Sequence, residues 1–408
     1  MGAPATFRVV VVGGSLGGLN AALWLRAAGC AVTVFERAAV PLEDRGAGIV
    51  LHPATIRYLG LPGGQPVEEI SAPATWLRYL DPAGHIAHES ACAYRFTAYN
   101  VLYRGLLRCL GSDHYHLGAE CVGFEQDATG VTVRFADGRA ERCDLLVCAD
   151  GIASLGRRLL FPACTPHYAG YIAWRGVVSE EELSEATFAL LHGGITYFLL
   201  PDGHILVYPI PNRDGVVEPG RRLMNWLWYR NVAPGAALAT LSERRGSERW
   251  LISIPAGAVA EQAVRQLRHD ASALPRPLAE TIIRTQQPFI QVIYDIAAPR
   301  MAVGRVVLIG DAAFTVRPHV AAGTAKAAED AWTLAQALRG QVDCLATALT
   351  HWDAQQRALG ERVLARARTA GEQLQHGRWP VGRPLPFGLY TEGDSALADA
   401  SGGSWHER

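Results

Sequence analysis

The chain has 408 residues, a length that suggests two domains, or one domain with a large insertion. Hydrophobic residues make up 49% and charged residues 19%, the balance of a soluble globular protein, and the net charge of −1 gives no reason to expect nucleic acid or an anionic membrane as a partner. Eight cysteines without a C-x-x-C pair, no histidine cluster with metal-ligand spacing, no long apolar span and no secretory signal predict a cytoplasmic protein without a metal.

The first forty residues have the order strand, glycine-rich turn, helix, strand, acid. Residues 8–12 are a β-branched apolar run, and they lead directly into Gly13-Gly14-Ser15-Leu16-Gly17-Gly18. Apolar residues at helical spacing follow and stop at Gly29. Residues 31–35 are a second apolar run, which ends in Glu36. This order predicts a βαβ unit that binds a dinucleotide.

The residue types fit that chemistry. Glycine lets the main chain turn sharply and approach a pyrophosphate, and the helix N-terminus offers free N–H groups to it. Glu36 is well placed to accept hydrogen bonds from a ribose. The middle glycine of G-x-G-x-x-G is replaced by Ser15, which is small enough to keep the approach open. A glycine-rich turn in an α/β protein without a nucleotide is the alternative.

Two further features follow in the middle of the chain. Residues 131–135 alternate between apolar and polar, and Asp137-Gly138 after them indicates a hairpin. Residues 144–149 are an apolar run expected to form a buried strand. It leads into Asp150-Gly151, with Ser154 and Arg157 at the spacing D-G-x-x-S-x-x-R.

The composition changes after residue 167. Residues 195–200 and 204–210 are predicted strands, joined by the turn Pro201-Asp202-Gly203. Residues 223–232 are rich in tryptophan and tyrosine. They are suited to a platform for an aromatic ligand, and ordinary packing is an equal alternative.

The last third carries one more motif and a long helix. A strand over 305–309 precedes Gly310-Asp311, and the stretch from Arg317 to Thr324 opens a helix that runs through Leu338. Residues 347–375 are predicted to be a long amphipathic helix, and 380–386 an irregular tail.

The three motifs, in this order, resemble the group A flavoprotein monooxygenases, the para-hydroxybenzoate hydroxylase-like family. The likeness spans nearly the whole chain. Within the family, the turn with Ser15 and the stretches at 168–176, 203–211, 317–327 and 374–377 are similar to a subgroup that hydroxylates dihydroxypyridine rings. The resemblance implies an α/β fold with a Rossmann-like FAD-binding domain, a mixed β-sheet substrate domain and a long C-terminal helix. The expected division is 1–75, 98–166 and 290–380 for the FAD-binding domain, 76–97 and 167–289 for the substrate domain, and 381–408 for a C-terminal tail.

The resemblance also implies a set of residues for non-covalent FAD. It assigns the pyrophosphate to the glycine-rich turn, the adenosine ribose to an acid and its neighbour, the adenine to a strand main chain, the ribityl chain to the Gly-Asp motif, and the flavin ring to two loops. The residues expected to contact FAD are Gly13, Ser15, Leu16, Gly18, Glu36, Arg37, Gly48, Ile49, Val50, Arg104, Val122, Asp150, Arg157, Asp311, Pro318, Ala321, Ala322, Gly323 and Thr324. Solvated surface charge is the alternative for Arg104 and Arg157.

The chemistry implied by the family is hydroxylation of an electron-rich aromatic or heteroaromatic ring by O₂ through a flavin C4a-hydroperoxide, with NADPH or NADH as a transient reductant. The protein must then exclude water, orient the ring and help to deprotonate a ring hydroxyl. The candidate catalytic residues are His52, Tyr208 and His319. A structural role is equally open for His52 and is favoured for His319.

Two alternatives stay open at this point. Epoxidation or Baeyer–Villiger oxygenation uses the same cofactor and fold, because a fold does not fix a function. The chain is also compatible with an FAD-binding protein that has no turnover. A homodimer is compatible with the sequence as well.

Overall fold

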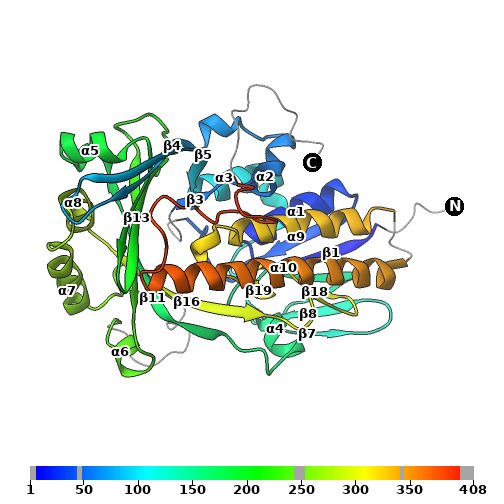
Figure 1. Ribbon diagram of the computed structural model, residues 1–408. Coiled ribbons are helices and arrows are strands. Elements are labelled where there is room, and N and C mark those ends of the chain that lie inside the picture. The colour runs from blue at the N-terminus through cyan, green and yellow to red at the C-terminus, as the bar shows by residue number, and fades with distance from the viewer. Residues whose placement is uncertain (1–5, 44–47, 243–252, 341–343, 396–408) are drawn as a thin grey trace.

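A mostly parallel sheet forms from the valine- and leucine-rich runs of the sequence, and its edge strand β17 pairs antiparallel with β18 (Figure 1). The computed structural model describes residues 6–43, 48–242, 253–340 and 344–395. Strand β1 pairs in parallel with its neighbours on both sides, and its valines are buried, as expected for a central strand covered on both faces. The strand order is β17 (Ala302–Val303), β18 (Val306–Leu308), β10 (Leu145–Cys148), β1 (Arg8–Val12), β2 (Ala31–Phe35) and β6 (Tyr115–His116).

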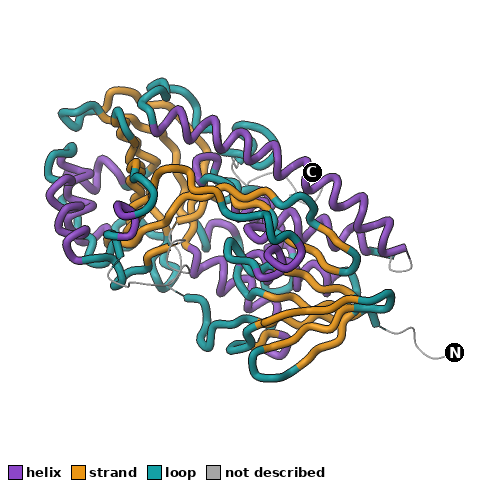
Figure 2. Tube along the Cα trace, turned by 90° about the horizontal axis from the view of Figure 1, so that it is seen from below, coloured by secondary structure: helices purple, strands orange, loops and turns teal. Residues whose placement is uncertain are grey.

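Helices cover this sheet and join it to the rest of the molecule. Helix α1 starts where the glycine-rich turn ends and packs against α3 and α9. Helix α10 runs across the front of the molecule in Figure 1 and along its upper margin in Figure 2, and it reaches from α9 to the strands of the second sheet. No helix among the described residues is long and apolar enough to span a membrane. The helices of this part are α1 (Leu16–Ala27), α2 (Pro53–Ile56), α3 (Tyr99–Leu110), α4 (Leu155–Leu160), α9 (Gly323–Leu338) and α10 (Leu345–Gln375).

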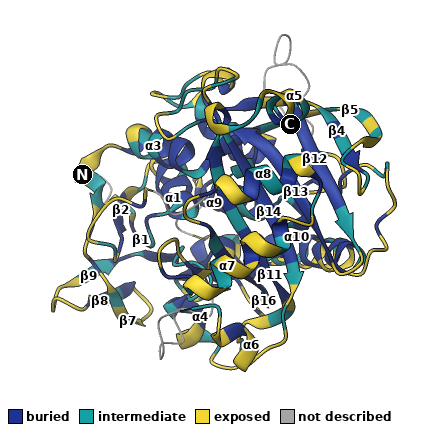
Figure 3. Cartoon of the chain, turned by 90° about the vertical axis from the view of Figure 1, so that its left-hand side faces the viewer, coloured by how far each residue is buried: buried dark blue, intermediate teal, exposed yellow. Residues whose placement is uncertain are grey.

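The second sheet is mixed and has ten strands within the described part of the chain. One face packs into the same core as the parallel sheet, and the other face is covered by a separate set of helices, whose outer sides are exposed (Figure 3). Its strands are β15 (Ser253–Ile254), β16 (Phe289–Ala297), β11 (His167–Ser179), β14 (Leu223–Asn231), β13 (Gly203–Ile210), β12 (Gly194–Leu200), β4 (Ala72–Leu80), β5 (Ile86–Ala98) and β3 (Gly48–Val50), with β19 (Phe314–Thr315) beside β16. The remaining helices of this part are α5 (Glu185–Leu191), α6 (Ala236–Ala239), α7 (Glu261–Ala271) and α8 (Arg276–Arg284).

The tryptophans of β14 do not form a platform for a ligand, so that interpretation was wrong for them. Because side chains alternate along a strand, Trp226 and Trp228 point to the outer face and pack with α7 and α8. The Trp226 indole N–H donates to the hydroxyl of Thr285 at 2.7 Å. Leu227 and Tyr229 point to the inner face, toward the parallel sheet. The packing alternative therefore holds for the indole rings.

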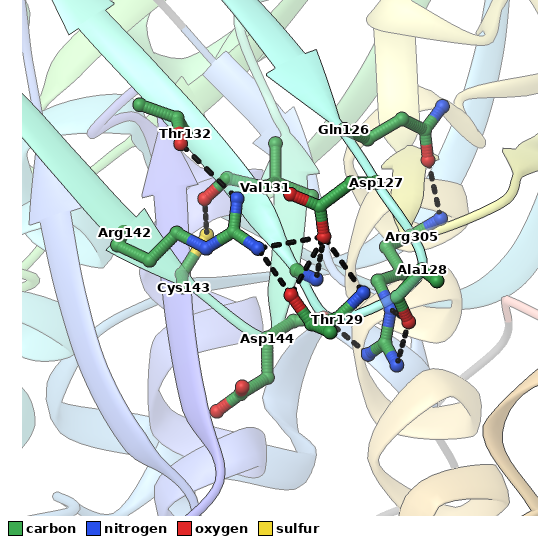
Figure 4. Close-up of polar contacts among 11 residues, drawn as sticks. Gln126, Asp127, Ala128, Thr129, Val131, Thr132, Arg142, Cys143, Asp144 and Arg305 are labelled. Carbon is green, nitrogen blue, oxygen red and sulfur yellow. Dashed lines mark hydrogen bonds and ion pairs between the residues drawn. The ribbon is translucent and has the colours of Figure 1, made fainter.

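A small antiparallel sheet packs against strands β1 and β10 of the first sheet, and Figure 4 shows the polar contacts of one of its turns. The Asp137-Gly138 turn joins two of its strands, so the predicted hairpin is confirmed. Asp127 Oδ1 accepts hydrogen bonds from the Arg142 guanidinium and from the hydroxyl and N–H of Thr129, and these lower the pKa of Asp127. The Arg305 guanidinium donates to the carbonyl of Ala128 and thereby ties this sheet to β18. The three strands are β7 (Cys121–Gln126), β8 (Val131–Phe135) and β9 (Ala140–Cys143).

The architecture agrees with the predicted α/β class. A Rossmann-like sheet, a mixed second sheet and a long C-terminal helix are all present. The helix predicted over 347–375 spans Leu345–Gln375, and the helix expected through Leu338 ends there.

Candidate functional site

The glycine-rich turn joins β1 to α1 as predicted. Gly13 has a φ of +102°, and a Cβ there would lie 2.3 Å from the carbonyl oxygen of Ala149. A Cβ at Gly18 would lie 1.8 Å from the carbonyl oxygen of Gly13. Neither position therefore accepts a larger residue without moving the main chain. The turn brings the N-terminus of α1 to the edge of the sheet.

Glu36 holds this turn in place. Its Oε2 accepts a hydrogen bond from the Gly14 N–H and its Oε1 one from the Ala38 N–H, both at 2.8 Å. The side chain is buried. Because each carboxylate oxygen accepts more than one hydrogen bond, both oxygens keep capacity for a ribose hydroxyl.

A cavity of about 340 Å³ lies against this turn. The N-termini of both α1 and α9 border it, so two sets of free N–H groups with positive dipole ends face it. The Ser15 hydroxyl lies 2.8 Å from the Tyr99 hydroxyl, and both residues line the cavity. The predicted cofactor residues that line it are Ser15, Leu16, Gly48, Ile49, Asp311, Gly323 and Thr324.

Asp311 follows β18 in a 3₁₀ turn and lines the cavity. Its side chain is accessible from the cavity, but the surrounding protein removes most of the bulk water. This desolvation raises the pKa of Asp311 to about 6, against the opposing charge of Arg157. Asp311 therefore brings a carboxyl group to the same cavity as the two helix N-termini.

Arg157 is neither a solvated surface charge nor exposed to the cavity. It is 1% exposed, and its guanidinium donates to the carbonyl oxygens of Ala312 at 2.9 Å and of Ile152. Asp150 caps the following helix, because its Oδ2 accepts from the Leu155 N–H at 2.7 Å. Burial raises the pKa of Asp150. The D-G motif thus fixes the main chain beside the Gly-Asp turn.

Several predicted contacts lie away from the cavity. Arg104 bridges Glu43 at 2.5 Å and the carbonyl oxygen of Arg213 at 2.7 Å, with its side chain 38% exposed. Arg37 is exposed. Val122 on β7 is 52% exposed. Within the described part of the chain, none of these three residues lines this cavity or the second, smaller cavity described below.

The loop before α9 carries the remaining predicted cofactor residues. Ala321 has a φ of +53° and is the one non-glycine residue with a positive φ in the described part of the chain. Pro318 lines a second cavity of about 210 Å³, which shares Arg175, Gln291 and Asp311 with the larger one. Ala322 and Val50 are buried and line neither cavity.

His52 supports this loop. Its Nε2 lies 2.8 Å from the carbonyl oxygen of Ala321. A carbonyl oxygen only accepts, so Nε2 carries the proton and Nδ1 is the free acceptor of the neutral ring. Burial lowers the pKa of His52 to about 4, which keeps the ring neutral near pH 7. No described residue contacts its buried Nδ1 through a hydrogen bond.

Tyr208 lies on the inner face of β13. Its ring stacks on Phe96 with centroids 4.2 Å apart, and a Cβ at Gly48 would lie 2.4 Å from it. Burial raises the pKa of Tyr208 to about 12, so the hydroxyl stays protonated and can donate but cannot serve as a base.

His319 faces the same aromatic cluster from the loop before α9. Its Nε2 lies 2.8 Å from the Tyr171 hydroxyl, and its ring centroid lies 4.7 Å from that of Tyr229 and 5.3 Å from that of His204. Burial lowers the pKa of His319 well below its usual value. His319 thus lies among buried aromatic rings and lines neither cavity.

The inner face of the large sheet adds polar residues that the motifs did not indicate. Arg175 Nη1 donates to Gln291 Oε1 at 2.9 Å, and Asn225 Oδ1 accepts from the Gly48 N–H at 3.2 Å. His204 is buried against Tyr229, and burial lowers its pKa to about 3. These residues share one face because side chains alternate along a strand. The sequence did not indicate this, because the face on which a residue lies depends on where the strand begins. Tyr99 at the N-terminus of α3 was missed as well, because its contact with Ser15 joins residues 84 positions apart in the chain.

The residues around the larger cavity fit FAD. Two helix N-termini bring free N–H groups to the cavity, of the kind that phosphate oxygens and a flavin ring bind, and Ser15, Tyr99 and Asp311 add polar groups. The tight glycines keep room for a pyrophosphate. Fold and site together define a flavin-dinucleotide-binding protein of the Rossmann-like class.

Comparisons with known proteins identify the family. Residues 8–52 match the family described as pyridine nucleotide-disulphide oxidoreductase, and residues 168–295 match the one described as FAD binding domain-like. The chain is 38% identical to 2,6-dihydroxypyridine 3-monooxygenase of Paenarthrobacter nicotinovorans, over 95% of this chain and 96% of that protein. It is similar to the structure of 2,6-dihydroxypyridine-3-hydroxylase from Arthrobacter nicotinovorans, with a TM-score of 0.89, 38% identity and coverage of 96% and 98% of the two chains. It is also similar to Klebsiella pneumoniae HpxO in complex with FAD and uric acid, with a TM-score of 0.72, 25% identity and coverage of 90% and 89%.

The chain therefore belongs to the FAD-dependent aromatic-ring monooxygenases. It is an enzyme that uses FAD and a nicotinamide cofactor, and the resemblance that the three motifs indicated is confirmed.

Proposed function

We propose that this enzyme hydroxylates a small heteroaromatic ring with two hydroxyl or oxo groups, of the dihydroxypyridine type, with O₂ and either NADPH or NADH. The observation that carries the proposal is the 38% identity to 2,6-dihydroxypyridine 3-monooxygenase, which extends over the cavity and the large sheet alike. Such rings are electron-rich, as electrophilic oxygenation of carbon requires.

The polar atoms of the inner sheet face support a ligand of this type. The Asn225 side chain is fully buried, and its Nδ2 has no hydrogen-bond partner among the described residues. The Nδ1 atoms of His52 and His204 are likewise buried without one. An unsatisfied buried polar group costs about 1–3 kcal/mol, so such groups usually meet a ligand or water. A flat ring with ring oxygens and a ring nitrogen offers both donors and acceptors to them.

Each candidate residue has a role that follows from its chemistry. FAD, when bound, supplies reducing equivalents taken from NAD(P)H and the activated oxygen. His52 Nδ1 would accept a hydrogen bond from a ring hydroxyl, and its low pKa suits orientation better than proton storage. Tyr208 would donate to a ring oxygen, since its hydroxyl stays protonated. His319 would position the wall of the pocket through Tyr171.

We extend the proposal to the FAD contacts and the domains. The α1 N-terminus at Ser15 would hold the pyrophosphate, Glu36 the ribose, Asp311 the ribityl chain and the α9 N-terminus the pyrimidine edge of the flavin. The proposed FAD-binding domain is 1–75, 98–166 and 290–380, and the substrate domain 76–97 and 167–289. Strand β16 links the two, because it pairs with β11 and with β19.

The test is NAD(P)H oxidation by the holoenzyme with a panel of dihydroxypyridines, phenols and purines, with ¹⁸O₂ and mass spectrometry of the product. We expect strong stimulation by one dihydroxylated heteroaromatic ring and one ¹⁸O atom in the product. Stimulation only by a carbocyclic phenol, or an inserted ring oxygen in place of a hydroxyl, would overturn the substrate class.

A pair of variants on one strand tests the pocket. Asn225→Leu should raise the KM for the ring about tenfold, because a buried donor is lost. Trp228→Phe lies on the opposite face of β14 and should leave the KM unchanged. Equal KM values for both variants would show that the inner face does not bind the substrate.

Assembly and compartment complete the proposal. All eight cysteines are unpaired, which supports a reducing, cytoplasmic compartment. A homodimer is tested by size-exclusion chromatography with light scattering.

A further inference from the structure

The only lysine of the chain is buried in the first turn of α9. Lys326 is 1% exposed, and its amine forms an ion pair with Asp330, which is fully buried. A cation is disfavoured near a helix N-terminus, and lysine placed four residues before an acid is the weaker orientation of such a pair. The helix itself therefore gives no reason for a lysine here, and the reason must lie in its tertiary contacts.

Asp330 reaches the Gly-Asp turn with its other oxygen. Oδ2 accepts a hydrogen bond from the Gly310 N–H at 2.9 Å. Gly310 has a φ of +57°, and a Cβ there would lie 2.9 Å from the Cβ of Ala327, so the turn lies directly on the helix. Gly310, Asp311 and Ala327 all line the larger cavity. One buried carboxylate thus links two walls of the FAD site.

We propose that Lys326 is a positioning residue for FAD, which acts by holding the Asp330 carboxylate on the Gly310 N–H and so fixes Asp311 relative to the α9 N-terminus. Lys326 does not border the cavity itself. Its amine lies 5.5 Å from the centroid of the Phe314 ring, on the side away from solvent.

The surroundings of Asp330 make its charge state depend on this lysine. On α9 the charged groups that face it are Lys326 and Glu329. From α10, the Trp352 indole N–H donates to its main-chain oxygen at 3.3 Å, and Asp353 is engaged with the N–H groups of Met301 and Ala302. Burial raises the pKa of Asp330, while the charge and hydrogen bond of Lys326 lower it. Without the amine, the carboxylate would be an unpaired buried charge at high pH.

The test compares two variants of the holoenzyme by the dissociation constant for FAD, measured by ultrafiltration and flavin fluorescence from pH 6 to 9. Lys326→Met should weaken FAD binding at least tenfold at pH 8, and the loss should become smaller as the pH falls, because protonation removes the unpaired charge of Asp330. The double variant Lys326→Met with Asp330→Asn should return to within about threefold of the wild type and lose the pH dependence, since an amide oxygen still accepts from Gly310. Arg339→Met, at the exposed C-terminal end of α9, is the matched control for loss of a positive charge and should bind FAD normally.

Two outcomes overturn the proposal. One is unchanged FAD affinity of Lys326→Met at every pH. The other is a double variant as weak as the single one, because the lysine would then not act through Asp330. Should Lys326→Met fail to fold, the wild type provides the test, because its single lysine is a unique amine label apart from the N-terminus. Added FAD should slow the labelling of Lys326 at least tenfold, and equal rates would refute the coupling.

Discussion

We expect the buried, neutral ring of His52 to make the folded protein less stable in acid. The perturbation is His52→Gln, which keeps a side-chain N–H for the carbonyl oxygen of Ala321 but cannot titrate. Burial lowers the pKa of His52 from 6.5 to about 4. The unfolded chain therefore binds more protons than the folded one between about pH 6.5 and pH 4. Folding stability from this residue is fully present above pH 6.5 and is lost as the pH falls toward 4.

The magnitude follows from the shift. A difference of about 2.5 pKa units, at about 1.4 kcal/mol per unit, corresponds to about 3 kcal/mol when the pH has fallen to 4. At pH 5 the loss is about 2 kcal/mol by the same linkage relation. His204 and His319 are also buried and neutral, and they add to the acid sensitivity of wild type and variant equally.

The assay is urea unfolding in saturating FAD, followed by tryptophan fluorescence at pH 7.5 and pH 5. When the pH falls from 7.5 to 5, the free energy of unfolding should decrease by about 2 kcal/mol less in His52→Gln than in the wild type. His269→Gln, at an exposed position on α7, is the control and should follow the wild type. If His52→Gln loses as much stability as the wild type, then His52 is not a buried neutral ring and the assignment of its tautomer fails.

Three further predictions concern the cofactor and the pocket. Tyr99→Phe should weaken FAD binding about fivefold, because it removes the hydrogen bond to Ser15 and such a bond contributes about 1 kcal/mol. A flavin fluorescence titration that gives the wild-type dissociation constant would contradict this. Gly18→Ala should yield protein without FAD, judged by the ratio of flavin to protein absorbance, because its Cβ would lie 1.8 Å from the carbonyl oxygen of Gly13; a yellow variant would refute the close approach. Tyr208→Phe should lower kcat/KM without changing its pH profile between pH 6 and 9, since the hydroxyl does not ionise there; the loss of an ionisation from the profile would identify Tyr208 as a base after all.

The sequence was most informative where the main chain itself imposes the residue type. The turn with Gly13 and Gly18 admits no side chain, and Asp311 follows a buried strand, so both appear as motifs that local order reveals. The apolar periodicity of the long helix predicted α10 nearly to the residue. In each case the physical cause is local and therefore visible in a short stretch of chain.

Residues whose role depends on distant partners were harder to assign. Arg157 was expected at a phosphate or at the surface, yet it lies buried on the carbonyl oxygen of Ala312, more than 150 residues away. The tryptophans of β14 suggested a ligand platform, but their register turned them to the outer face. A shift of one residue exchanges the two faces of a strand, and composition alone does not fix it.

The sequence by itself thus determined the dinucleotide fold and the family, because these rest on glycine geometry, strand and helix periodicity and three ordered motifs. Only the tertiary structure decided which polar side chains meet. His52 with Ala321 and Asn225 with Gly48 are contacts between segments far apart in the chain, and Asp330 with Gly310 joins a helix to a turn that lies 20 residues before it. The physical reason is that burial and hydrogen bonding at a site depend on the packing of whole elements, and no local pattern encodes that packing.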